Sequence, residues 1–134
     1  MKRILIVDDE KNVSISLSIG LKRQGFDVET ALNGQEALLK MREAIFDCLL
    51  TDVRMPKVNG IELTRITNQI YPSIHIILMS AYDFNEIVEQ NEDLNKFPKL
   101  SKPFDILEVV NLINRQHSDE EEIGYKSVRT RGYA

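Results

Sequence analysis

The fold is decided by a short apolar run that ends in two acids, ILIVDD at residues 4–9. Two runs of the same kind follow, CLL at residues 48–50 and IHIILM at residues 74–79. Continuous branched apolar runs are typical of strands buried on both faces of a parallel sheet. Weaker strand signals lie at residues 26–30 and 99–101, so we expect five strands.

Segments of helical period separate these runs. The first carries Val13, Leu17 and Leu21 on one face, and Gly25 is expected to end it. Four more helices are expected after Asn33-Gly34, over residues 61–70, after Asp83 and after Asp105. Strict alternation of strands and helices predicts one α/β domain, with a parallel sheet covered by helices on both faces.

Length and composition agree with this prediction. The chain has 134 residues, of which 43% are hydrophobic, enough for one domain with its own core. The formal charge of −4 argues against nucleic acid or an anionic membrane as a partner. One cysteine excludes an intramolecular disulfide framework and a cysteine-cluster zinc site. The apolar runs are too short for a membrane span or a signal peptide, so we expect a cytoplasmic protein.

The C-terminal residues differ in composition from the rest. They begin with an acidic run, DEEE at residues 119–122, and continue with basic residues and little periodicity. We expect a domain at residues 1–117 and a charged, flexible tail at residues 118–134. The alternatives are an arm that binds a partner or an extension of the last helix.

Five polar side chains follow the predicted strands. Asp8 and Asp9 follow the first strand, Asp52 the third, Ser80 the fourth and Lys102 the fifth. The carboxyl ends of parallel strands share one edge of a sheet, so we expect all five side chains there. Singly, each would more often be a turn former, a helix cap or a solvated side chain.

The combination of these side chains indicates a chemistry. Three neighbouring carboxylates repel one another unless a cation neutralises them or one binds a proton. Mg²⁺ prefers oxygen ligands and is typically bound by one or two carboxylates together with phosphate and water. An ammonium beside it can hold a phosphoryl oxygen. The residues therefore predict a site for Mg²⁺ and phosphate.

An ordered set of motifs resembles the receiver domain of two-component response regulators over about residues 2–116. The motifs are VDDE at 7–10, TDVRMP at 51–56, NG at 59–60, SA at 80–81 and KPF at 102–104. The resemblance implies a flavodoxin-like (βα)5 doubly wound parallel sheet with strand order 2-1-3-4-5. It also implies a cis peptide bond before Pro103 and a signalling switch rather than a turnover enzyme.

The resemblance further implies roles in phosphoryl transfer. Asp52 would accept a phosphoryl group from a phosphohistidine. Lys102 would pair with the phosphoryl oxygens, and Ser80 would donate a hydrogen bond to one of them. Phosphoryl transfer needs positioning and neutralised oxygens, which these groups supply.

The metal site follows from the same resemblance. Asp9, Asp52 and the backbone carbonyl of Arg54 would ligate Mg²⁺, and Asp8 would support the metal mainly through water.

The expected partners are proteins. The phosphoryl donor would be a histidine kinase or a histidine phosphotransfer protein, and the phosphorylated state would alter binding to a downstream target. Direct nucleic-acid contact and membrane insertion are not expected. Three alternatives stay open: a phosphate shuttle in a multistep phosphorelay, a receiver-fold interaction module that is not phosphorylated, and the receiver of a longer transcription factor.

One position departs from the family. Receiver domains usually have Tyr or Phe three residues before the active-site lysine, whereas this chain has Lys99. We expect output through the fourth helix and the fifth strand to be weakened or altered, with Phe97 or Tyr82 as candidate substitutes. The unusual residues 91–96 predict a frayed end of the fourth helix.

Two further features have two interpretations each. Arg54 is either a solvated side chain or a shield that controls attacking water and thereby the phosphate lifetime. Ile15 and Ile19 point away from the apolar face of the first helix. They form either a docking patch for the phosphoryl donor or a tolerated apolar surface.

Overall fold

The computed structural model describes residues 2–54 and 59–115. The strands form one parallel sheet in the order β2-β1-β3-β4-β5, which confirms the predicted flavodoxin-like topology. The strands are β1 (Arg3–Val7), β2 (Asp27–Ala31), β3 (Cys48–Asp52), β4 (His75–Ser80) and β5 (Lys99–Ser101). The helices are α1 (Lys11–Arg23), α2 (Gly34–Glu43), α3 (Gly60–Ile70), α4 (Phe84–Gln90) and the short 3₁₀ helix η1 (Glu92–Lys96). Residues 106–115 are also helical.

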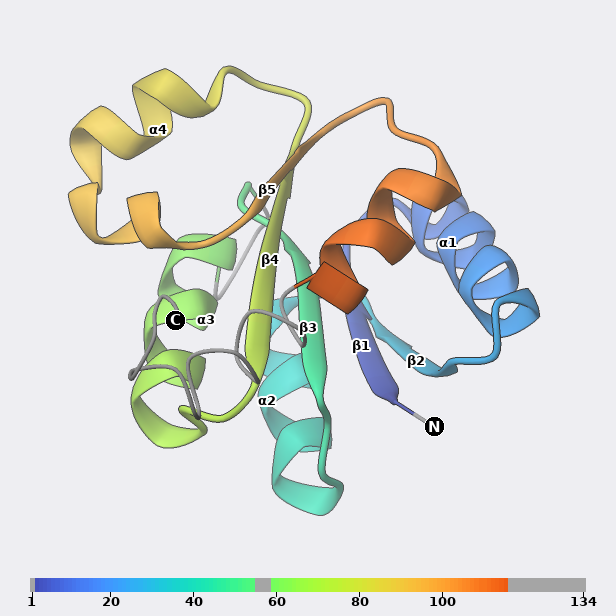
Figure 1. Cartoon of the computed structure of the whole chain (residues 1–134). Helices are drawn as coiled ribbons and strands as arrows, with labels where there is room; N and C mark the ends of the chain where they lie inside the picture. Colours follow the sequence, from blue (N-terminus) through green and yellow to red (C-terminus); the bar gives the residue numbers. More distant parts are fainter. Residues whose placement is uncertain (1, 55–58, 116–134) are drawn as a thin grey trace, which may run out of the picture.

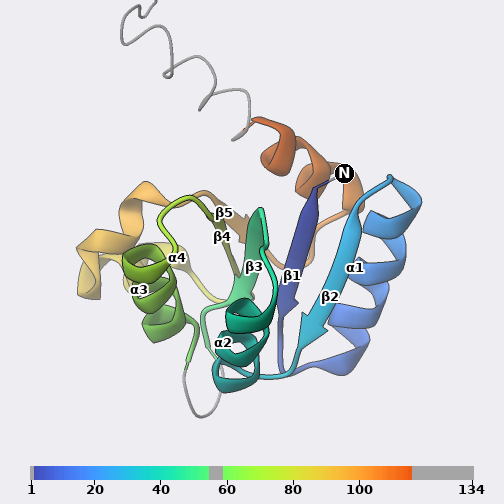
Figure 2. The ribbon, with the colours of Figure 1, turned by 90° about the horizontal axis from the view of Figure 1, so that it is seen from below.

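Alternating side chains of the central strands build two core layers. Ile4 and Ile6 of β1 belong to the layer that contains Leu17 of α1 and the helix at residues 106–115. Leu5 and Val7 belong to the opposite layer, with side chains from α2, α3 and α4. Figures 1 and 2 show the same division, with α1 and the last helix on one face and α2 and α3 on the other. Burial on both faces explains why the central strands β1, β3 and β4 are mostly apolar, whereas the edge strands β2 and β5 carry partly exposed polar residues.

Short polar residues and one glycine set the helix ends. The side chains of Asn33, Asn59 and Asp83 accept hydrogen bonds from the first turns of α2, α3 and α4. Gly25 follows α1 with a φ of 96°, a left-handed conformation that favours glycine. The predicted end of the first helix at Gly25 is therefore confirmed.

Three boundaries differ from the sequence predictions. β3 and β4 include Asp52 and Ser80 as their last residues, so the sheet itself holds both side chains. α4 ends at Gln90, and the predicted frayed end is instead the 3₁₀ helix η1, whose Leu94 is fully buried. One buried leucine is enough to order this short polar segment against the core.

The Lys102–Pro103 peptide bond is cis, as expected from the resemblance. None of the helices described within residues 2–54 and 59–115 is long and apolar enough to cross a membrane. The expected tail at residues 118–134 lies outside the described residues, so the domain boundary after residue 117 stays a prediction.

Candidate functional site

Three strand ends converge on one ammonium group. Asp8 directly follows β1, Asp52 ends β3, and Lys102 directly follows β5. The Nζ of Lys102 donates hydrogen bonds of 2.8 Å to Asp8 Oδ2 and of 2.8 Å to Asp52 Oδ2. The Lys102 side chain is 12% exposed and that of Asp8 is completely buried. The sheet edge therefore brings together Asp8, Asp52 and Lys102, three of the five side chains that the sequence predicted there.

The loops after β1 and β3 fix the second oxygen of each carboxylate. Asp8 Oδ1 accepts a hydrogen bond of 2.9 Å from the backbone N–H of Glu10. Asp52 Oδ1 accepts one of 3.0 Å from the backbone N–H of Arg54. Both carboxylates are thus oriented by their own chain as well as by Lys102.

Burial and pairing shift the proton affinities in this cluster. Burial raises the pKa of Asp8 above its ordinary value, although the hydrogen bond from Lys102 opposes this shift. For Lys102, burial disfavours the ammonium, but the hydrogen bonds to Asp52 and Asp8 outweigh burial and raise its pKa. Lys102 is therefore a permanent cation at neutral pH, held against buried carboxylates.

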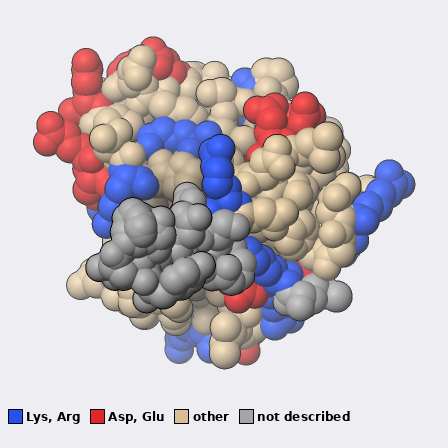
Figure 3. Space-filling model, viewed as in Figure 1, with Lys and Arg blue, Asp and Glu red and all other residues tan. Residues whose placement is uncertain are grey.

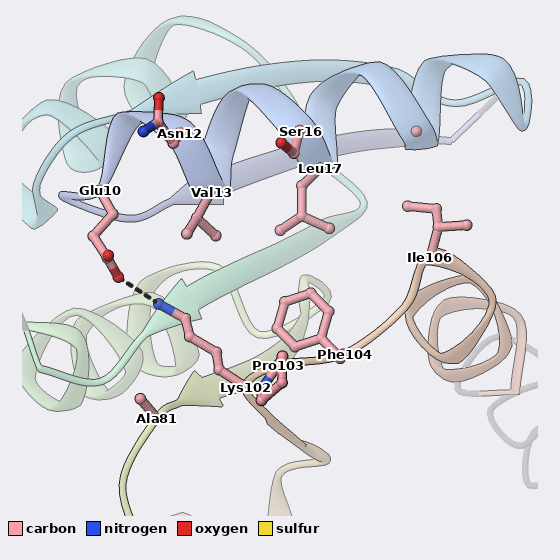
Figure 4. Close-up of a pocket in the computed structure, with 11 residues that line it drawn as sticks. Glu10, Asn12, Val13, Ser16, Leu17, Ala81, Lys102, Pro103, Phe104 and Ile106 are labelled. Carbon is pink, nitrogen blue, oxygen red and sulfur yellow. Dashed lines mark hydrogen bonds and ion pairs between the residues drawn. The ribbon is translucent and has the colours of Figure 1, made fainter.

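A third carboxylate, which sequence reasoning did not identify, joins the cluster. Oxygens of Asp8, Glu10 and Asp52 lie within 4.8 Å of one another. Glu10 Oε1 also lies 3.4 Å from Lys102 Nζ. Figure 4 draws this contact as a dashed line. The sequence offered one clue to Glu10, which is that it lies two residues after Asp8 and directly before the first helix. Asp9, by contrast, is exposed and is not a member of this group.

The donor chemistry of the cluster suits a hard divalent cation. All three ligand atoms are carboxylate oxygens, the type that Mg²⁺ and Ca²⁺ prefer. Three carboxylates face one ammonium, so a further positive charge would be favourable here.

Ser80, Arg54 and Tyr82 lie at a second side of the site. Ser80 is buried, and its Oγ accepts a hydrogen bond of 2.9 Å from the backbone N–H of Tyr82. The guanidinium of Arg54 lies 4.7 Å from the centroid of the Tyr82 ring. The sequence singled out Arg54 as a candidate shield but could not identify its stacking partner, because the two loops meet only in the tertiary structure.

Comparisons with known proteins agree with this geometry. The family model of the response regulator receiver domain matches residues 4–114. The chain belongs to this family. Receiver domains are generally signalling modules of two-component systems rather than enzymes.

Several relatives cover most of this receiver. Sporulation initiation phosphotransferase F of Bacillus subtilis (strain 168) is 30% identical over 85% of this chain and 92% of its own length. The response regulator receiver protein CpdR of Brucella abortus (strain 2308) is 32% identical over 86% of this chain and 96% of its own. The structure of the response regulator protein TrrA of Thermotoga maritima, in complex with Mg(2+)-BeF, superposes with a TM-score of 0.77. It is 30% identical and covers 86% of this chain and 98% of that one.

This receiver places its unusual lysine in a structural role. Lys99 lies in β5, and its Nζ donates hydrogen bonds of 2.6 Å to the carbonyl of Phe97 and of 3.1 Å to that of Asn95. Partial burial lowers the pKa of this ammonium. The position that usually carries a switch aromatic thus ties β5 to the end of η1.

Proposed function

We propose that this receiver is phosphorylated on Asp52 by a phosphohistidine donor and that the phosphorylated state changes its protein partners. The observation that carries the proposal is the Asp52 carboxylate, held at the end of β3 by Lys102 and by the N–H of Arg54. One carboxylate oxygen of Asp52 attacks phosphorus, and a P–O bond replaces the P–N bond of the donor. The imidazole leaves with the electron pair and is protonated by solvent.

Lys102 neutralises charge during this transfer. Its ammonium already contacts Asp52 Oδ2, and Asp52 loses its formal negative charge when it becomes an acyl phosphate. The ammonium then pairs with a phosphoryl oxygen at the same place, as a point charge. We assign to Ser80, whose hydroxyl is buried one strand away, a hydrogen bond to another phosphoryl oxygen.

Mg²⁺ fits the oxygen-only donor set of the site. Asp9, Asp52 and the backbone carbonyl of Arg54 would hold it, and Asp8 would support it mainly through water. Glu10 offers a further oxygen beside Asp8 and Asp52. The bound ion would supply positive charge against the phosphoryl oxygens. The similar structure in complex with Mg(2+)-BeF supports this choice of metal.

Incubation with acetyl phosphate and Mg²⁺, followed by intact mass measurement, tests the proposal. We expect a single phosphoryl adduct on the wild type and none on Asp52→Ala. No adduct on the wild type over a range of Mg²⁺ concentrations would favour an interaction module that is not phosphorylated.

A phosphate shuttle in a multistep relay is the second candidate. A shuttle needs little conformational output, and Lys99 occupies the position of the usual switch aromatic. One relative is named a phosphotransferase, which supports the same candidate. Return of the phosphoryl group from Asp52 to a histidine phosphotransfer protein would support the shuttle. Pull-downs with and without beryllofluoride would instead detect an effector that binds only the loaded state.

Arg54 is expected to lengthen the life of the acyl phosphate. Arg54 lies two residues after Asp52 in the chain, and its guanidinium stacks on Tyr82. We assign to this pair the role of shielding Asp52 from attacking water, so Arg54→Ala should speed dephosphorylation about three-fold. Decay of the intact-mass adduct measures the rate. Tyr82→Phe retains the ring and should behave as the wild type, whereas equal decay of wild type and Arg54→Ala would contradict the role.

Two exposed isoleucines on α1 are proposed to dock the phosphoryl donor. Ile15 is 52% exposed and Ile19 is 49% exposed. Ile15→Glu should slow phosphotransfer from a histidine kinase about ten-fold and leave the acetyl phosphate reaction unchanged. Leu39→Glu on α2, at 54% exposure, is the matched control. An equal effect of both substitutions would identify Ile15 as ordinary surface.

The proposal also includes the boundaries of the receiver domain and its location in the cell. The receiver would occupy residues 1–117 and residues 118–134 would form a tail. The single cysteine and the charged composition agree with a cytoplasmic location.

A further inference from the structure

The segment formed by α4 and η1 packs weakly against the rest of the receiver. α4 has seven residues, of which Ile87 alone is buried, and η1 buries only Leu94. Most of the remaining surface of the segment is polar, and Figure 3 shows acidic side chains gathered over this part of the molecule. Phe84 and Phe97, at the two ends of the segment, are only partly buried against the same core. Two buried anchors, Ile87 and Leu94, over so many residues leave the segment at the low-stability end of the fold.

Open cavities lie on two sides of this segment. One, of about 680 Å³, lies between α4, η1 and β5 and is lined by Phe84 and Lys99 among others. The other, of about 310 Å³, separates Ile87 and Asn91 from Val53 and Arg54, directly after the phosphoacceptor. The segment therefore has space to shift, and one of its neighbours is the loop that begins at Asp52.

One arginine from α3 ties this segment down. Arg65 Nε lies 2.8 Å from Asp93 Oδ2, and Arg65 Nη2 lies 3.0 Å from Asp93 Oδ1. The same Nη2 donates a hydrogen bond of 2.8 Å to Asn91 Oδ1. A guanidinium that binds a carboxylate with two parallel hydrogen bonds fixes both distance and orientation. We call Arg65, Asn91 and Asp93 the α3–α4 latch.

Asn91 connects the latch to the helix itself. Its Nδ2 donates a hydrogen bond of 3.1 Å to the carbonyl of Ile87, in the last turn of α4. Its own backbone carbonyl accepts a hydrogen bond of 3.0 Å from Leu94 N–H in η1. Arg65 thus acts on the junction between α4 and η1, close to both buried anchors.

We propose that the α3–α4 latch sets the resting position of the α4–η1 segment and that loading of Asp52 favours its release. The second part rests on the function proposed above. Loading changes the charge and size of the group at Asp52, and the neighbouring residues Val53 and Arg54 line the cavity shared with Ile87 and Asn91. A segment with two positions responds to loading if the loaded site fits one of them better. Linkage then requires that opening the latch strengthens loading.

Hydrogen exchange on the full chain tests the latch without any phosphoryl group. Arg65→Ala and Asp93→Asn should each speed exchange in residues 84–97 about five-fold. Arg65→Lys, which retains the charge but not the paired hydrogen bonds, should fall between Arg65→Ala and the wild type. Arg42→Ala removes an exposed arginine from α2 and should leave exchange unchanged. High salt should reproduce part of the effect in the wild type, because the side chains of Arg65 and Asp93 are each about half exposed.

Unchanged exchange in both Arg65→Ala and Asp93→Asn would overturn the latch. Because Asp93 is an exposed side chain at the start of η1, Asp93→Asn tests the latch even if Arg65→Ala fails to fold.

Beryllofluoride with Mg²⁺ tests the coupling. It should speed exchange in residues 84–97 of the wild type, and ¹⁹F NMR titration should show about five-fold tighter binding to Arg65→Ala. Equal affinity of wild type, Arg65→Ala and Arg42→Ala would overturn the coupling. Absence of binding to the wild type would overturn the proposed function together with the coupling, while the exchange of the unloaded variants would still decide the latch.

Discussion

Lys102→Met is expected to lower the free energy of unfolding by about 3 kcal/mol and to abolish phosphorylation of Asp52. The substitution removes the cation that lies 2.8 Å from both Asp8 and Asp52 and leaves a completely buried carboxylate unpaired. An uncompensated buried charge is among the most destabilising changes in a protein core. Urea unfolding in the presence of a chelator measures the stability, and intact mass after acetyl phosphate treatment measures the phosphorylation.

A double variant separates the charge effect from lost packing. Asp8→Asn combined with Lys102→Met removes both charges, so it should be more stable than Lys102→Met alone. Mg²⁺ should restore more stability to Lys102→Met than to the wild type, because no ammonium then competes for the same carboxylates. If Lys102→Met matched the wild type in urea, the ammonium would not stabilise the buried acid.

Gly60→Ala is expected to cost about 3 kcal/mol and to disturb the loop that carries Asp52. A Cβ at residue 60 would lie 1.8 Å from the backbone carbonyl oxygen of Asp52 and 2.5 Å from the Cα of Val53. Both are backbone atoms, one in the last residue of β3 and one in the residue directly after it. The overlap is therefore relieved only if the strand end or the start of α3 shifts. Urea unfolding measures the loss, and the rate of phosphorylation by acetyl phosphate reports the displaced acceptor.

Gly20→Ala in α1 is the matched control. Its Cβ would lie 2.7 Å from the Cδ1 of Ile106, which is the far end of a flexible side chain. Rotation of that side chain relieves the contact, and alanine favours a helix interior more than glycine does. We expect a change within about 1 kcal/mol. Similar losses in both variants would mean that helix propensity, and not the contact with Asp52, decides the outcome.

The reason for a glycine at position 60 could not be read from the sequence. Asn59-Gly60 is one of the motifs that carry the resemblance to receiver domains, and Asn59 caps α3. Gly60, however, lies in the first turn of the helix and is not among the glycines with positive φ. It is needed because the backbone of β3 passes too close for any side chain, a distance that local sequence patterns do not contain.

The side-chain contacts between elements that are far apart in the sequence became visible only in the tertiary structure. Glu10, in the loop after β1, contacts Lys102, which follows β5. Arg54 stacks on Tyr82, and Arg65 of α3 binds Asp93 of η1. These pairs are far apart in the sequence, and each member alone reads as a solvated charge or an exposed ring. Their roles depend on where the strand ends and helix termini meet.

The sequence by itself determined the alternation of elements and the placement of Asp8, Asp52 and Lys102 at the ends of strands, whereas the strand order followed from the resemblance to receiver domains. The reason is that apolar runs, caps and turn residues act locally, and a parallel sheet then brings all its strand ends to one edge. Which carboxylates share the ammonium, which side of Asp52 is covered and what ties down α4 followed from side-chain packing across elements. Such packing depends on distances of a few ångströms, which only the assembled fold sets.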